Sequence, residues 1–287
     1  MQGIQMSDVF LLGLLGLLVG SFLNVVIHRL PKMMEMRWAA ECAELHRTHE
    51  GPADETVVEP AKFNLMVPRS RCPHCGHQIR WFENIPVISY LVLRGACSHC
   101  SAPISPRYPL VELVCGSLFA WCGWSWGMTW EALAWCFFSA SVLALACIDW
   151  DTTLLPDDIT LPLLWSGLCA AGLGFINTTL PHALWGAVAG YMSLWLVFWA
   201  FKLTTGKEGM GYGDFKLFAA FGAWFGWQAL IPIILMASVI GAVVGIAIKF
   251  MGQLREGGYV PFGPFLAIAA LTAMIFGPSS ILAVIGL

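Results

Sequence analysis

Two aspartates stand at positions where an acidic side chain is expected to do chemistry. Asp214 follows three glycines in the stretch GMGYGDFKL and opens an apolar run, while Asp149 directly follows another apolar run. An ionisable group next to such a run is costly to desolvate, which marks it as a candidate functional residue. Two aspartates on separate helix ends can share one proton, as in aspartic proteases. The alternative is that each aspartate only caps a helix.

The glycines before Asp214 favour a peptide substrate. Gly209, Gly211 and Gly213 carry no side chains, so an extended backbone can approach closely. One ionised carboxylate can activate a water molecule, while a protonated one polarises the peptide carbonyl. We therefore predict peptide hydrolysis by Asp149 and Asp214. For Asp157 and Asp158, which precede the next apolar run, we predict N-capping, because aspartate is a favoured N-cap.

Four cysteines form a second chemical group, in the similar units RCPHCGHQI and ACSHCSAPI. Their pattern is Cys72-x2-Cys75 and Cys97-x2-Cys100, and two such pairs indicate a four-thiolate zinc site. Iron is the alternative metal. Disulfides are disfavoured if the loop faces a reducing cytoplasm. The neighbouring histidines are not expected to be ligands, because four thiolates already complete the coordination: His74, His77 and His99.

The composition shows what kind of chain must position these groups. Of 287 residues, 58% are hydrophobic and 11% are charged, whereas soluble domains have about 25% charged residues. The mean hydropathy is +0.72. This composition predicts a polytopic membrane protein. A net charge of −3 without a basic tract argues against a nucleic-acid partner.

Apolar runs near the length of a membrane span, about 17–25 residues, divide the chain. The first lacks the flanks of a cleaved signal peptide, so we expect it to remain as a helix. The last contains Gly277-Pro278, where we expect a break. The eight runs are Val9–Ile27, Leu110–Gly127, Trp130–Ile148, Ile159–Ile176, His182–Leu203, Asp214–Trp227, Ala229–Phe250 and Phe262 to near the C-terminus.

The basic residues indicate an orientation for these eight helices. Ten of the fifteen Lys and Arg residues fall between Arg29 and Arg107. If the N-terminus is periplasmic, all fifteen lie in or beside cytoplasmic loops, as the enrichment of such loops in basic residues requires. Asp149 and Asp214 then both lie at cytoplasmic ends of helices, so they can meet. The sequence thus predicts an all-α membrane protein of about eight transmembrane helices, with a small cytoplasmic zinc-knuckle domain between helices one and two.

We expect three parts along the chain. Residues 1–29 form the first transmembrane helix, residues 30–108 form the cytoplasmic loop domain with the zinc site, and residues 109–287 form the membrane-embedded protease core. Within the loop domain, MMEMRWAAECAELHRTHE is predicted to be a surface or interfacial helix and GPADETVVEPAK a linker. Asn24, deep in the first apolar run, is expected to form a hydrogen bond across the bundle.

Together these residues resemble the type IV prepilin peptidases, the bifunctional leader peptidase/N-methyltransferases of bacterial inner membranes. The motifs that carry the resemblance are GSFLNVVIHRLP, the paired cysteines, ENIPVISYLVLRG, RYPLVE, Asp149 with LLPD downstream, and GMGYGDFK. The resemblance implies that Asp149 and Asp214 are the catalytic pair. It also implies cleavage of type IV prepilins and pseudopilins of type II secretion, after a glycine that ends a short basic leader. The new N-terminal residue is then methylated with S-adenosylmethionine as donor.

One departure from the family pattern concerns methylation. Family members often have lysine after the glycine of the RG dipeptide, whereas Ala96 follows Arg94-Gly95 here. No GxGxxG loop is present, so the sequence does not locate the donor-binding residues. Two alternatives remain open at this point: a transporter with an intramembrane carboxylate pair, and a membrane methyltransferase without protease activity.

Overall fold

The computed structural model describes residues 5–50, 63–251 and 260–285; the predicted linker at residues 51–62 lies outside them. The described chain is helical, with only isolated bridges in place of strands. It divides into two compact units, which are described separately. One unit comprises Met1–Gly13 and Leu118–Leu287, and the other comprises Leu14–Ser117.

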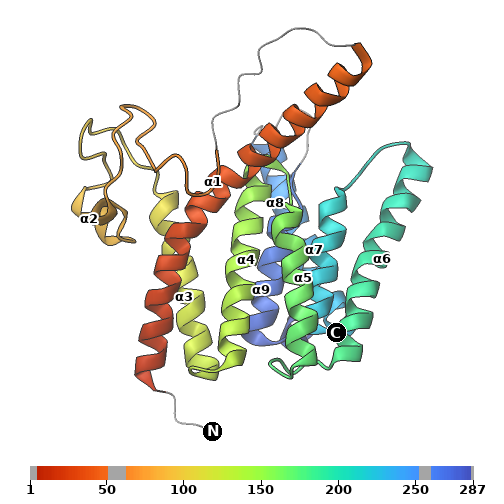
Figure 1. Cartoon of the computed structure of the whole chain (residues 1–287). Helices are drawn as coiled ribbons and strands as arrows, with labels where there is room; N and C mark the ends of the chain where they lie inside the picture. Colours follow the sequence, from red (N-terminus) through yellow and green to blue (C-terminus); the bar gives the residue numbers. More distant parts are fainter. Residues whose placement is uncertain (1–4, 51–62, 252–259, 286–287) are drawn as a thin grey trace. The chain divides into compact units, whose positions relative to one another are not determined.

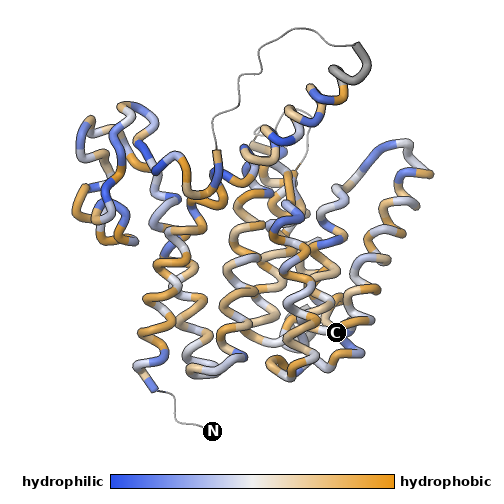
Figure 2. The backbone as a smooth tube through the Cα atoms, viewed as in Figure 1, coloured by the Kyte–Doolittle hydropathy of each residue, from blue (hydrophilic) through white to orange (hydrophobic). Residues whose placement is uncertain are grey.

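The larger unit is a bundle of apolar helices (Figure 1). Hydrophobic residues cover most of the length of these helices (Figure 2). The long helix α3 (Arg107–Trp126) enters it with its second half. The other elements are α4 (Trp130–Thr152), α5 (Asp157–Gly172), α6 (Leu180–Thr205), α7 (Tyr212–Phe225), η2 (Trp227–Ala229), α8 (Leu230–Phe250), α9 (Gly263–Phe276) and α10 (Pro278–Ile285).

Helix α7 is the core of this bundle. Except for Lys216, it is buried from Asp214 to Trp224, and it packs between α5 and α6. Against α6 the contact is between backbones, because Gly186 and Gly222 face each other with no space for a Cβ atom at either. Such small residues let apolar helices approach closely. On the α5 side, the Trp224 indole N–H donates to the Leu163 carbonyl at 2.8 Å.

All eight predicted apolar runs are helical, and the predicted break is confirmed. Helix α9 ends at Phe276, Gly277 has φ +82°, and α10 begins at Pro278. Four helices of the described chain are long and apolar enough to cross a membrane, beginning at Met6, Trp130, Leu180 and Trp227. Helices α7 and α9 have only 14 residues each. At 1.5 Å per residue each is about 21 Å long, shorter than the roughly 30 Å hydrocarbon core.

The smaller unit contains most of α1 (Met6–Glu50), the start of α3, and the irregular segment between them. That segment holds η1 (Trp81–Asn84) and α2 (Ile88–Val92). The predicted surface helix is helical, but it is not a separate element. It continues the first apolar helix without interruption, with Pro31 inside α1.

Side chains of α1 and α3 attach the irregular segment to these helices. The predicted bond of Asn24 is confirmed, because its amide donates to the Tyr108 carbonyl at 3.1 Å. The buried Arg29 guanidinium donates to the carbonyls of Asn64, at 2.9 Å, and Pro68, at 2.7 Å. On α3, the buried Glu112 carboxylate accepts from the Val87 N–H at 2.8 Å. Buried charged groups of this kind must be hydrogen-bonded, and here their bonds fix the segment.

Candidate active site and metal centre

Asp149 lies in the last turn of α4 and is 5% exposed. The helix ends soon after it because Thr153 adopts the left-handed conformation, with φ +57°, and donates its N–H to the Asp149 carbonyl at 2.9 Å. The carboxylate accepts a hydrogen bond from the Gly263 N–H, with 2.9 Å between Gly263 N and Asp149 Oδ2. The predicted acid is therefore buried at a helix end and held by a residue of α9.

Asp214 lies in the first turn of α7 and is also 5% exposed. Its Oδ2 accepts from the N–H of Gly211, the N-cap residue, at 3.2 Å. This contact is the carboxylate half of a capping box. Its Oδ1, however, is buried and has no hydrogen-bond partner among the described residues. Capping therefore accounts for one oxygen of Asp214 and leaves the other available.

The structure brings the two predicted aspartates into one buried site. Asp149 and Asp214 both belong to the larger unit and interact electrostatically. The link between α4 and α5 contributes to this, since a Cβ atom on Gly213 would lie 2.7 Å from the Leu155 Cβ. The chain that leaves the helix of Asp149 thus packs against the residue before Asp214, and only glycine fits there.

The predicted capping by Asp157 and Asp158 is wrong. The N-cap of α5 is Pro156, and no side-chain cap hydrogen bond is formed. Asp157 instead accepts from the Lys216 ammonium, with 2.7 Å from Nζ to each carboxylate oxygen. Lys216 is two residues beyond Asp214, so this ion pair links α5 to the start of α7, which carries Asp214.

Sequence reasoning missed Gly263 and Lys216. The available signal for Gly263 was its position between two prolines, in the stretch Pro261-Phe262-Gly263-Pro264. Gly263 lies at the start of the last apolar run, where a glycine between two prolines could serve more than a turn. For Lys216, its place directly after the glycine-aspartate stretch was the only signal.

The four predicted metal ligands form one cluster in the smaller unit. The Sγ atoms of Cys72, Cys75, Cys97 and Cys100 all lie within 4.8 Å of one another. The Cys72 and Cys100 sulfurs are 3.8 Å apart. A tetrahedral zinc with bonds of about 2.3 Å places its sulfurs about 3.8 Å apart. The sulfur atoms present therefore fit a four-thiolate metal site.

The backbone repeats in the two cysteine units. Gly76 N donates to the Cys72 carbonyl at 2.9 Å, and Ser101 N donates to the Cys97 carbonyl at 3.0 Å. Gly76 and Ser101 both have a positive φ, +72° and +58°. The backbone N–H groups of Cys75 and His74 lower the pKa of the Cys72 thiol to about 6. Those of Cys100 and His99 also lower the pKa of the Cys97 thiol. These bonds favour the thiolate forms of Cys72 and Cys97, the form that binds metal. At Cys75, in contrast, the lowering of the pKa by the His77 N–H is outweighed by burial and the neighbouring thiols, which raise the pKa to about 12.

Glu83 joins the two cysteine units and was not identified from the sequence. Its carboxylate accepts from the Arg80 N–H at 2.7 Å and from the Ser98 hydroxyl at 2.6 Å. The Arg80 N–H, followed by the Ser98 hydroxyl, lowers the pKa of this carboxyl. Because Ser98 lies in the second unit and Arg80 follows the first, the carboxylate holds them together.

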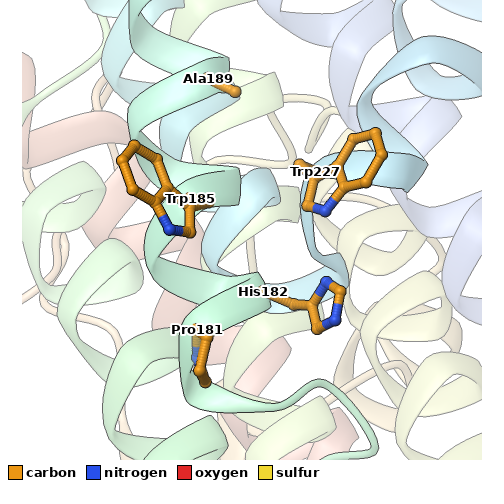
Figure 3. A pocket seen from close by; sticks show the side chains of 5 residues that line it. All are labelled: Pro181, His182, Trp185, Ala189 and Trp227. Atoms are coloured by element: carbon orange, nitrogen blue, oxygen red, sulfur yellow. The ribbon is translucent and has the colours of Figure 1, made fainter.

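A separate apolar groove lies at the opposite end of α7 from Asp214. Its lining comes from the start of α6 and from η2, and its volume is about 370 Å³ (Figure 3). Neither of the two predicted catalytic aspartates is among its lining residues. Its lining residues are Pro181, His182, Trp185, Ala189 and Trp227.

Two family models match the chain, one over the segment with the four cysteines and one over the segment with the two aspartates. Residues 14–126, which contain the four cysteines, match the bacterial Peptidase A24 N-terminal domain. Residues 136–246, which contain both aspartates, match the type IV leader peptidase family.

Relatives of known name cover nearly the whole chain. A prepilin leader peptidase/N-methyltransferase of Stutzerimonas stutzeri is 54% identical over 92% of this chain and 89% of its own length. One from Pseudomonas aeruginosa is 53% identical over the same shares. One from Aeromonas hydrophila is 52% identical over 93% of this chain and 90% of its own length.

No solved structure matches the chain. The sequence matches are nevertheless sufficient, because identity above one half extends through both the cysteine segment and the helical core. The chain belongs to the family of the prepilin leader peptidase/N-methyltransferases.

Proposed function

We propose that this protein is an intramembrane aspartyl endopeptidase that removes the basic leader of type IV prepilins and pseudopilins after a glycine. It then N-methylates the new N-terminal residue. The observation that carries the proposal is the buried pair Asp149 and Asp214, in the segment that matches the type IV leader peptidase family. The names of the relatives support the substrate and both activities.

The dyad hydrolyses the peptide bond with a shared proton. The ionised carboxylate takes a proton from water, whose oxygen attacks the scissile carbonyl carbon. The protonated carboxyl donates its proton to the carbonyl oxygen, giving a neutral tetrahedral intermediate. When the C–N bond breaks, the amine leaving group takes a proton from the carboxyl that had accepted it from water. One hydroxyl of the intermediate returns its proton to the other carboxylate as the C=O bond forms again, which restores the singly protonated pair. Two buried carboxylates that interact electrostatically cannot both ionise cheaply, so one proton stays on the pair.

Asparagine substitutions test the dyad. Asp149→Asn and Asp214→Asn keep the side-chain size and remove the ionisable group, so we expect each to lower cleavage by orders of magnitude. The double variant should be scarcely worse than either single one, because residues that act as a unit are not additive. Asp158→Asn, on the neighbouring helix α5, is the control and should keep most activity. The measurement is cleavage of a prepilin leader peptide by the purified protein.

A folded Asp214→Asn or Asp149→Asn variant that cleaves at a near-normal rate contradicts the dyad. Folding is checked by the unfolding temperature and by methyl transfer onto a peptide that is already cleaved.

We infer that the four-cysteine site holds one structural zinc, with iron as the alternative metal. The fit of the sulfur spacing to a zinc tetrahedron supports this. All four coordination positions are filled by protein thiolates, which leaves none for a substrate. The metal would therefore stabilise the folded segment and take no part in peptide hydrolysis.

The methyl donor proposed for the second activity is S-adenosylmethionine, which supplies an electrophilic methyl group to the amine freed by cleavage. The names of the relatives include this transfer. We assign it to the zinc-bearing loop and the cytoplasmic helix ends, because the amine freed by cleavage is already at that membrane boundary. The donor-binding residues are not part of this assignment.

We further propose a location in the bacterial inner membrane, with a periplasmic N-terminus and a cytoplasmic cysteine segment. Several apolar helices support a membrane protein, and the one-sided distribution of Lys and Arg supports the orientation. The protein's partners are then prepilins, pseudopilins and the lipid bilayer. The division at residues 29 and 108 remains a prediction.

A further inference from the structure

The chain returns to Asp149 from the far end of its sequence. Gly263 is 114 residues later, and its N–H donates to Asp149 Oδ2 in a buried hydrogen bond of 2.9 Å. Gly263 is the first residue of α9, after the N-cap Phe262. The first N–H groups of a helix have no partner within the helix, and they carry its positive end. The Asp149 carboxylate therefore satisfies one of these groups and lies where a negative charge is favoured.

The contact leaves no space for a side chain. A Cβ atom built on Gly263 would lie 2.6 Å from Oδ2 of Asp149 and 3.1 Å from its Cγ. The Asp149 side chain is buried, and α4 and α9 pack against each other, so neither has room to withdraw. A glycine at this position is thus required for the approach of the backbone to the carboxylate.

The two acids are consequently not equivalent. Both carboxylates accept a backbone N–H at the N-terminus of a 14-residue helix, but the bond to Asp149 is the shorter one, at 2.9 Å. Asp214 has one longer bond, 3.2 Å from Gly211 N, and its buried Oδ1 has no partner among the described residues. A charge-assisted hydrogen bond stabilises the ionised acid, whereas a protonated carboxyl has a hydrogen of its own to donate.

We infer that Gly263 is a positioning residue for cleavage, which holds Asp149 as the ionised member of the pair and leaves the proton on Asp214. In this arrangement Asp149 accepts the proton from water, and Asp214 donates to the substrate carbonyl. The inference rests on the proposed function of the dyad. It adds a third element, the N-terminus of α9, to the two helices that carry the acids.

Alanine and proline substitutions test the role of Gly263. Gly263→Ala forces the carboxylate away from its donor, and Gly263→Pro also removes the N–H while suiting the first turn of a helix. We expect kcat for leader cleavage to fall about 10- to 100-fold with alanine, the range for losing a hydrogen bond to a charged group, and further with proline. KM should change by less than about twofold, because the contact is made to the catalytic acid and not to the substrate. Methyl transfer onto an already cleaved peptide should be unchanged.

Gly245→Ala is the matched control, because a Cβ atom there has nothing within 4 Å. It should leave cleavage unchanged and should not lower the unfolding temperature, since alanine is the better helix former. A second measurement covers the case in which Gly263→Ala is poorly folded. The steric conflict is with the carboxylate, so Gly263→Ala combined with Asp149→Ala should unfold at a higher temperature than Gly263→Ala alone.

Three results overturn the inference: a normal kcat in Gly263→Ala, an equal loss of cleavage and methyl transfer, or no recovery of stability in the double variant. Asp149→Asn is measured in parallel. If it is inactive while Gly263→Ala is normal, only the role of Gly263 is wrong. If Asp149→Asn cleaves normally, the dyad itself is wrong.

Discussion

At the scale of single residues, Gly95 and Gly76 have nearly the same conformation in different surroundings. Their φ angles are +68° and +72°. A Cβ atom on Gly95 would lie 3.0 Å from the Tyr90 hydroxyl oxygen, whereas one on Gly76 has nothing within 4 Å. The Gly95 N–H also donates to the Tyr90 carbonyl at 2.9 Å. Gly95 therefore packs so closely against Tyr90 that a side chain would contact it, whereas Gly76 is required only by the positive φ of its turn.

These two glycines form a matched pair for testing methylation. Alanine at either position has the cost of a left-handed conformation, about 1–2 kcal/mol, so both variants should lose similar stability. Only Gly95→Ala also displaces Tyr90. We expect it to lower methyl transfer by an order of magnitude or more, since small displacements near a reacting centre have effects of that size. Cleavage should change less. Equal losses of methyl transfer in Gly95→Ala and Gly76→Ala would contradict this role.

At the scale of helices, both short helices of the core begin beside one of the two buried aspartates. Helix α7 starts with the turn of Asp214, and α9 starts with the N–H bound to Asp149. With 14 residues each, they are about two thirds of a membrane thickness in length. Helices of this length can begin below the membrane surface. Their first N–H groups are then hydrogen-bonded by buried carboxylates instead of by water.

The ion pair between Asp157 and Lys216 aligns α5 with α7 and yields a prediction at this scale. The side chains are 52% and 32% exposed, so the pair contributes no more than about 1 kcal/mol to stability. Lys216→Asp places two carboxylates together, and we expect it to lower cleavage several-fold by shifting the turn that carries Asp214. Adding Asp157→Lys restores opposite charges and should recover most of the cleavage rate. If the double variant remains as slow as Lys216→Asp, the pair does not position Asp214.

At the scale of the whole molecule, the two chemistries belong to different compact units. The four cysteines lie in Leu14–Ser117, whereas both aspartates lie in Leu118–Leu287. A structural metal contributes folding free energy to the segment that binds it. The helical core, in contrast, is held by packing of apolar side chains and close backbone contacts.

Loss of the metal should therefore affect the cysteine segment first. We expect Cys72→Ser to lower the bound metal below one per chain and to expose residues 63–106 to limited proteolysis, with activity lost as a consequence. Cys115→Ser is the control, because this cysteine is buried in α3 and is not part of the four-sulfur cluster. Metal content is measured on the purified protein. Preparations that contain neither zinc nor iron would contradict the site.

The sequence by itself determined which segments are helices and which residues were candidates for chemistry. The paired cysteines and the break at Gly277-Pro278 are local patterns, in which residue type and spacing decide the structure directly. The same holds for the eight apolar runs, because burying apolar surface is favourable wherever a run lies. Asp149 and Asp214 stood out because an acid beside an apolar run is costly.

Only the tertiary structure decided the partners of these residues. Asp157 was expected to cap α5, but Lys216, 59 residues away, binds its carboxylate instead. The donor to Asp149 is 114 residues away at the start of α9. A hydrogen bond between segments so distant in sequence depends on how α4, α5, α7 and α9 pack, and no local pattern contains that information. Sequence position locates an acid, whereas packing determines which N–H or ammonium group meets it.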